Sequence, residues 1–134
     1  DAMGGDHAPR AAVAGALLAL ADLPRDHTIQ LVGPTATVEA TLAELLAGDH
    51  AALATHRDRV TVVEAPDVVG MTDKPSAVLR AKVNSSMAVG LRLQASGDSD
   101  AFVSAGNTGA QMAASAYFLG RHAGLARPAI GTLF

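Results

Sequence analysis

The sequence of 134 residues contains no cysteine and no tryptophan, and only 3% of its residues are aromatic. Without cysteine this stretch can form no disulfide, thiolate zinc site or cysteine nucleophile, and such a composition is typical of a reducing compartment. The formal net charge of -3 and the few aromatic rings provide neither a basic surface nor a stacking platform for nucleic acid. Nucleic-acid binding is therefore not expected.

Long apolar runs are also absent from the sequence. The longest run, residues 11–21, is shorter than the roughly 20 residues that a membrane-spanning helix needs. Asp22 follows this run where a signal peptide would carry a small-residue cleavage site. With 49% hydrophobic and 17% charged residues, the composition is instead typical of a globular protein.

Helix-like and strand-like segments alternate along the chain. The helical spacing of apolar residues predicts helices over residues 8–23, 35–47, 75–95 and 109–122. Short apolar segments predict strands at 28–32, 60–63 and 100–103, and the start of another at 128–134. Strands joined through helices pair in parallel by right-handed crossovers. The expected fold class is α/β, with a mostly parallel sheet flanked by helices on both faces.

The two ends of the sequence lack partners for their local structure. The chain opens on the loop of residues 1–6 (DAMGGD), with no strand before it, and closes on Ala129 and Ile130 without a cap. These ends predict a single incomplete α/β domain, residues 1–134, cut from a longer protein at both ends.

The strongest chemical signal is the segment 104–110 (SAGNTGA), between an expected strand and an expected helix. Open α/β sheets place ligands at strand carboxyl ends, where a helix N-terminus offers N–H groups to an anion. The candidate contacts are Ser104, Gly106, Asn107, Thr108 and Gly109. The segment is neither a Walker A motif nor G-x-G-x-x-G. An anion site and an ordinary turn capped by Asn107 or Thr108 fit the pattern equally well.

The opening loop carries a second signal, adjacent Gly4 and Gly5 followed by Asp6 and His7. It could cradle another anion or use Asp6 to orient a donor, although the residues alone favour Asp6 as a helix cap. His7 could act as a base because its pKa lies near neutrality, or it could simply be solvated. We expect this loop to meet segment 104–110 at the carboxyl ends of the strands.

A third signal lies within the expected helix 75–95. Polar residues in the middle of a helix tend to bond back to its backbone, so Ser85, Ser86 and the preceding Asn84 require a partner or a bend. Arg80 could clamp a phosphate with its planar fork, or pair with Asp73 on the surface. Residues two positions apart on a helix face different ways, so only one of Arg80 and Lys82 can join the loop cluster. We favour Arg80, because its position lies close to the face of the apolar Val83 and Met87.

Four segments, in the same order along the chain, resemble the signatures of PlsX-type phosphate acyltransferases. They are residues 1–6 with Pro9, residues 74–87 (KPSAVLRAKVNSSM), residues 104–110 and residues 127–129 (RPA). Four motifs in the same order are more specific than any one of them, and they cover essentially the whole chain. The resemblance implies a fold similar to isocitrate dehydrogenase and phosphotransacetylase. It also implies that the first strand and the C-terminal part of the enzyme lie outside this sequence.

The resemblance implies transfer of a fatty acyl group from acyl carrier protein to inorganic phosphate, giving acyl phosphate for phospholipid biosynthesis. It implies a cytoplasmic homodimer without cofactor or metal ion. It is also compatible with peripheral association at the inner face of the membrane through the C-terminal part that lies outside this sequence. Asn107 and Asp6 are the candidate catalytic residues. The candidate phosphate-binding residues are Gly4, Gly5, Arg80, Ser85, Ser86, Ser104, Gly106, Thr108 and Gly109.

Three other functions stay open at the level of sequence. A phosphotransacetylase-like enzyme would use acyl-coenzyme A in place of the carrier protein. A dehydrogenase of the related fold would use the same architecture for different chemistry, and a non-catalytic module would keep only the anion cradle.

Overall fold

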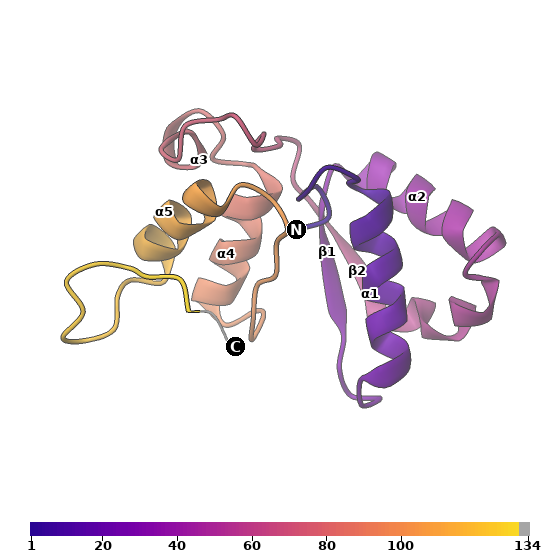
Figure 1. Cartoon of the computed structure of the whole chain (residues 1–134). Helices are drawn as coiled ribbons and strands as arrows, with labels where there is room; N and C mark the ends of the chain where they lie inside the picture. Colours follow the sequence, from indigo (N-terminus) through magenta and orange to yellow (C-terminus); the bar gives the residue numbers. More distant parts are fainter. Residues whose placement is uncertain (132–134) are drawn as a thin grey trace.

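The computed structural model describes residues 1–131 of the chain. Its elements, in order, are α1 (Arg10–Asp22), β1 (Ile29–Gly33), α2 (Thr35–Ala47), the 3-10 helix η1 (Ala51–Arg59), β2 (Val60–Glu64), α3 (Ala77–Arg80), α4 (Ser86–Ser96) and α5 (Thr108–Phe118). Figure 1 shows both strands grouped with α1 and α2, and the other three helices grouped beside them. We call residues 10–64 the sheet lobe and residues 65–118 the helical lobe.

The sheet consists of β1 and β2, which pair in parallel with Ile29 opposite Val60 and Gly33 opposite Glu64. Helix α2 and η1 form the crossover between them. Leu31 faces the core with α1 and α2, whereas the neighbouring Gln30, on the opposite face, donates to a carbonyl just beyond α4. The α/β class with parallel pairing and helices on both faces is confirmed, but the sheet is smaller than expected.

The expected strand 100–103 and the described part, 128–131, of the expected strand 128–134 differ from the prediction. Residues 100–103 run as irregular chain, as do residues 128–131, and residues 132–134 lie outside the described part. The backbone N–H of Ala2 donates to the carbonyl of Val32 (2.9 Å), while the Asp1 nitrogen donates to the carbonyl of Val103 (3.0 Å). The opening loop therefore lies between β1 and residues 100–103, and within residues 1–131 no strand pairs with residues 100–103.

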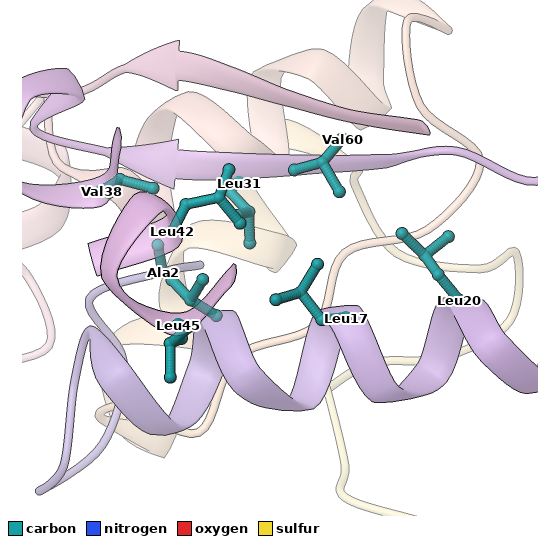
Figure 2. Close-up of a cluster of buried hydrophobic side chains, with 9 residues drawn as sticks. Ala2, Leu17, Leu20, Leu31, Val38, Leu42, Leu45 and Val60 are labelled. Atoms are coloured by element: carbon teal, nitrogen blue, oxygen red, sulfur yellow. The ribbon is translucent and has the colours of Figure 1, made fainter. Parts of the chain in front are cut away.

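The core of the sheet lobe is aliphatic (Figure 2). Its buried members are Ala2, Val13, Leu17, Leu20, Leu31, Val38, Leu42, Leu45 and Val60. The predicted inner faces of α1 and α2 supply six of these, because apolar residues at helical spacing share one face. Leu18, an apolar residue of the same helix, is instead 52% exposed.

Arg59 ties the end of α1 to the start of β2. Its guanidinium donates to the carbonyls of Leu20 (2.8 Å), Pro24 (2.6 Å) and His27 (2.8 Å). The last carbonyls of a helix have no partner within the helix. Arg59 therefore satisfies one of these groups and orders the connection from α1 to β1.

The helical lobe differs most from the expected structure, because the predicted helix 75–95 is two helices. Ser85 is the N-cap of α4 and accepts a hydrogen bond from the N–H of Ala88 (3.4 Å). The N–H of Ser86 donates to the carbonyl of Asp67 (3.1 Å), which fixes the break against the loop after β2. The polar run that needed a partner or a bend is thus a helix start.

The core of the helical lobe is built from smaller side chains. Its buried members are Val69, Val78, Met87, Ala88, Leu91, Ala110 and Ala114, with Phe102 packed against them. A Cβ atom on Gly90 would lie 2.2 Å from the Phe102 ring, so the ring rests directly on the α4 backbone. Helix α5 ends at Phe118 rather than at the expected residue 122. Within residues 1–131, no helix has the length and apolar character needed to cross a membrane.

Candidate functional site

The opening loop and the loop before α5 meet, as the sequence predicts. A Cβ atom on Gly4 would lie 2.8 Å from the backbone nitrogen of Gly106 and 2.8 Å from the Ser104 hydroxyl. Only glycine allows two backbones to approach so closely. Two motifs that lie a hundred residues apart therefore form one junction, beside the carboxyl end of β1.

Ser104 orders this junction from within. Its hydroxyl donates to Asp1 Oδ2 (2.6 Å) and accepts from the N–H of Gly106 (3.0 Å), while Asp1 Oδ1 accepts from the N–H of Met3 (3.0 Å). These bonds occupy the Ser104 hydroxyl and the Gly106 N–H, which were candidate phosphate donors. In this structure both groups hold the loops together.

The rest of the opening loop faces solvent. Gly5 has φ of 97°, a left-handed conformation that favours glycine. Asp6 and His7 are exposed. The prediction that Asp6 caps the first helix is wrong, because α1 starts after Pro9 and has no side-chain cap. Asp6 thus stays free of a capping role at the edge of the junction.

Asn107 is the N-cap of α5 and is only 8% exposed. Its Oδ1 accepts from the N–H of Ala110 (3.0 Å), as the capped-turn interpretation predicts. Its Nδ2 also faces the carbonyls of three residues in the loop after β2, Gly70 (3.1 Å), Met71 (3.3 Å) and Asp73 (3.0 Å). These long-range contacts were not foreseen from the sequence.

The first turn of α5 is covered by the same loop. A Cβ atom on Gly109 would lie 3.1 Å from the ring of Pro75, so glycine here lets the proline rest on the helix. Thr108, the first residue of α5, is exposed. Within the part of the chain that the structure describes, no hydrogen bond uses the N–H of Thr108 or Gly109. Such groups at a helix start favour an anion.

Lys82, rather than Arg80, pairs with Asp73. Lys82 Nζ donates to Asp73 Oδ2 (2.5 Å) and to the carbonyl of Val68 (2.7 Å). The Lys82 hydrogen bond, helped by the N–H of Gly70, lowers the pKa of Asp73. The expected choice between the two cations assumed a continuous helix. Because α3 ends at Arg80, the chain turns and brings Lys82 back to the loop, while Arg80 is exposed.

Ser85 and Ser86 are enclosed in the helical lobe, with 0% and 2% of their surface exposed. Ser85 caps α4 and Ser86 bonds to Asp67. This structure therefore provides a structural role for both residues and no access for phosphate. Among the described residues 1–131, no three His, Asp or Glu side chains are grouped so as to hold a metal ion.

Three loops therefore converge on the start of α5: the opening loop, residues 70–75 and residues 104–107. A family model described as "Fatty acid synthesis protein" matches residues 1–134. The chain belongs to this family. Proteins named phosphate acyltransferase from Herpetosiphon aurantiacus, Salinibacter ruber and Heliobacterium modesticaldum are 47%, 45% and 45% identical to it over 100%, 100% and 99% of the chain.

These relatives of the fatty acid synthesis protein family are much longer than the chain, which spans 34%, 38% and 37% of their respective lengths. The resemblance to phosphate acyltransferases seen in the sequence motifs is confirmed. Of those motifs, the opening loop and segment 104–110 meet at the junction, and Pro75 of the segment 74–87 covers the first turn of α5.

Proposed function

We propose that the full-length protein transfers a fatty acyl group from acyl carrier protein to inorganic phosphate, on a fold of the isocitrate dehydrogenase and phosphotransacetylase type. Family membership and the name shared by the relatives support this proposal. The observation that locates the proposed site is the contact between Gly4 and Gly106 beside the first turn of α5. Two motif loops that are about a hundred residues apart in the sequence meet there.

The reaction needs a bound phosphate, a thioester carbonyl and donors for the oxyanion. A phosphate oxygen attacks the carbonyl carbon, so a C–O bond forms, and the C–S bond then breaks to release the carrier thiolate, which takes up a proton. Holding both reactants together supplies much of the rate increase. Donors aimed at the developing oxyanion supply more, about 2.7 to 4 kcal/mol for one donor in a measured case.

The start of α5 offers the phosphate contacts in this chain. The N–H groups of Thr108 and Gly109 lie at the positive end of the helix dipole. Arg80 ends α3, which contacts α5, and its exposed guanidinium can pair with phosphate oxygens. Asp6 lies in the opening loop, where a carboxylate can orient a donor. The two backbones at Gly4 and Gly106 leave no room for other side chains between the loops.

The acyl donor is tested with the full-length enzyme. Acyl phosphate formation, measured by trapping with hydroxylamine, is compared for acyl carrier protein and coenzyme A thioesters of the same acyl group at varied phosphate. We expect faster, phosphate-dependent formation from the carrier protein thioester. A preference for coenzyme A would favour the phosphotransacetylase-like alternative. Phosphate binding without product from either donor would favour a non-catalytic module.

The phosphate site is tested by Arg80→Ala in the same enzyme. We expect the KM for phosphate to rise about 10-fold or more, because a hydrogen bond to a charged group contributes about 1.5 to 3 kcal/mol. The matched control is Arg25→Ala, an exposed arginine in the sheet lobe, for which we expect no change. An unchanged phosphate KM in Arg80→Ala would reject the role of this residue.

A further inference from the structure

The side-chain amide of Asn107 does more than cap a helix. Capping uses only its Oδ1, which accepts from the N–H of Ala110. Its Nδ2 points the other way, into a ring of three carbonyls contributed by Gly70, Met71 and Asp73. Because the residue is 8% exposed, these contacts are made away from solvent. One buried amide thus joins the start of α5 to the turn 70–73.

The same turn is held from a second side. Lys82 Nζ donates to Asp73 Oδ2 and to the carbonyl of Val68. Asp73 Oδ2 also accepts from the N–H of Gly70 (2.7 Å), and the N–H of Asp73 donates to the carbonyl of Gly70 (3.1 Å). The turn is therefore closed on itself and attached both to α5 and to the chain that follows α3.

We propose that Asn107 is a positioning residue that holds the turn 70–73 against α5 and so places Lys74 at the phosphate site; this placement rests on the proposed function. The backbone of Lys74 lies between Asp73, whose carbonyl accepts from Asn107, and Pro75, whose ring rests on Gly109. The Lys74 side chain is exposed. The Lys74 backbone is next to Pro75, which rests on Gly109, so the Lys74 cation is within reach of an anion bound at the first turn of α5.

The two roles of Asn107 require different atoms, so a substitution can separate them. A cap needs only an oxygen acceptor, and Asp serves as well as Asn at this position. The turn needs the Nδ2 donor, because three carbonyl oxygens repel a carboxylate oxygen in its place. Asn107→Asp therefore keeps the cap and removes the attachment. The matched control is Asn84→Asp, the same change at an exposed residue in the helical lobe.

The experiment uses the full-length protein and two readouts, hydrogen exchange at the amides of Gly70 and Asp73 and the affinity for inorganic phosphate measured by calorimetry. In Asn107→Asp we expect exchange at both amides to quicken about fivefold or more, the size expected for loss of one or two hydrogen bonds. We expect phosphate affinity to fall about tenfold. In Asn84→Asp both quantities should stay unchanged.

The pH dependence supplies a readout that a capping role would not move. Three surrounding carbonyls disfavour the ionised form of the introduced carboxyl and raise its pKa. Its protonated form has an O–H donor for the turn, so as the pH is lowered, phosphate affinity and amide exchange should approach those of the unmodified protein at the same pH. If Asn107→Asp fails to fold, Lys82→Gln provides a second test, because it leaves the α5 cap intact. We expect it to quicken exchange at the Asp73 amide and to weaken phosphate binding.

Each outcome decides a separate statement. Unchanged exchange in Asn107→Asp would overturn the proposed attachment of the turn 70–73 to α5, because the turn would then stay closed without the Nδ2 donor. Faster exchange with unchanged phosphate affinity would overturn the placement of Lys74 at the phosphate site. Normal phosphate binding without acyl transfer in the unmodified protein would refute the proposed function and leave the exchange result standing.

Discussion

The two lobes of the molecule bury their interiors by different means. In the sheet lobe the buried side chains are mostly large and aliphatic, such as Leu17 and Leu42, and they meet across helix and sheet (Figure 2). In the core cluster of the helical lobe three of the seven buried residues are alanines, and Ser85, Ser86 and Asn107 are also buried in this lobe. Hydrogen bonds between distant segments hold the second lobe in its arrangement.

This difference bears on where the candidate site lies. Apolar burial is non-directional, so a core of large aliphatic residues stabilises a lobe without fixing one polar group precisely. Hydrogen bonds have strict geometry, so the caps and the Asn107 contacts fix the loops around the start of α5. The sheet lobe thus serves as the support, and the helical lobe carries the specific contacts.

The largest effect should come from the core of the sheet lobe. Leu17 is fully buried between α1 and the sheet, so Leu17→Ala should lower the free energy of unfolding by about 2 to 5 kcal/mol through lost burial and the cavity left behind. Urea denaturation of the full-length protein measures it. Leu18→Ala, one position along on the exposed side, should change the stability by less than about 0.5 kcal/mol. Equal losses at the two positions would contradict the assignment of the buried face.

Periodicity predicted the sheet lobe well and the helical lobe poorly. The predicted helix 35–47 coincides with α2, and 8–23 exceeds α1 by two residues at its start and one at its end. Each of these helices has one buried face, which local spacing reveals. The helical period also runs through residues 81–85, where the chain breaks because Ser85 caps α4 and Asp67 pairs beside it. That partner is distant in sequence and leaves no local signal.

Replacing a helical glycine with alanine should change the stability less, and in opposite directions in the two lobes. Gly90→Ala places a methyl group where the Phe102 ring lies, and overpacking of this kind costs about 1 to 3 kcal/mol. Gly15, in α1, has nothing within 4 Å of its Cβ position. Gly15→Ala should therefore raise the stability by about 0.5 to 1 kcal/mol through helix propensity.

Thermal and urea denaturation of the two variants measure this contrast. Adding Phe102→Ala to Gly90→Ala should make the glycine substitution nearly neutral relative to Phe102→Ala alone, since the colliding ring is gone. A stabilising Gly90→Ala in the protein with Phe102 intact would show that the ring does not rest on α4.

The candidate site was predictable where its motifs are local. A polar and glycine-rich segment between a strand-like and a helix-like stretch predicted either an anion site or a cap at Asn107 or Thr108, and Asn107 is the cap. The expected meeting of motif loops at the carboxyl ends of the strands predicted that Gly4 and Gly106 lie together. The sequence did not indicate that the turn 70–73 and Lys82 belong to the candidate site. The turn contacts Asn107, and Lys82 contacts Asp73 of the turn, and no spacing rule connects these segments. The roles in binding phosphate stay predictions.

The smallest effect is on the pH dependence of the free energy of unfolding, and it tests whether the polar contacts of the helical lobe stabilise the protein. The hydrogen bond from Lys82, and then that from the N–H of Gly70, lower the pKa of Asp73 in the folded protein. The folded state therefore binds this proton less readily than the unfolded chain. The stabilisation from Asp73 is complete above the ordinary aspartate pKa of about 3.9 and is lost as the pH falls through the lower folded value.

Asp73→Asn removes this titration, so the free energy of unfolding should fall less steeply between about pH 5 and pH 2 than in the unmodified protein. Urea denaturation at a series of pH values measures the two slopes. In a Lys82→Gln background the same substitution should flatten the curve less, because the largest cause of the lowered pKa is already gone. Equal flattening in both backgrounds would show that Lys82 does not hold the Asp73 carboxylate, and the turn would then depend on Asn107 and on the hydrogen bonds between Gly70 and Asp73.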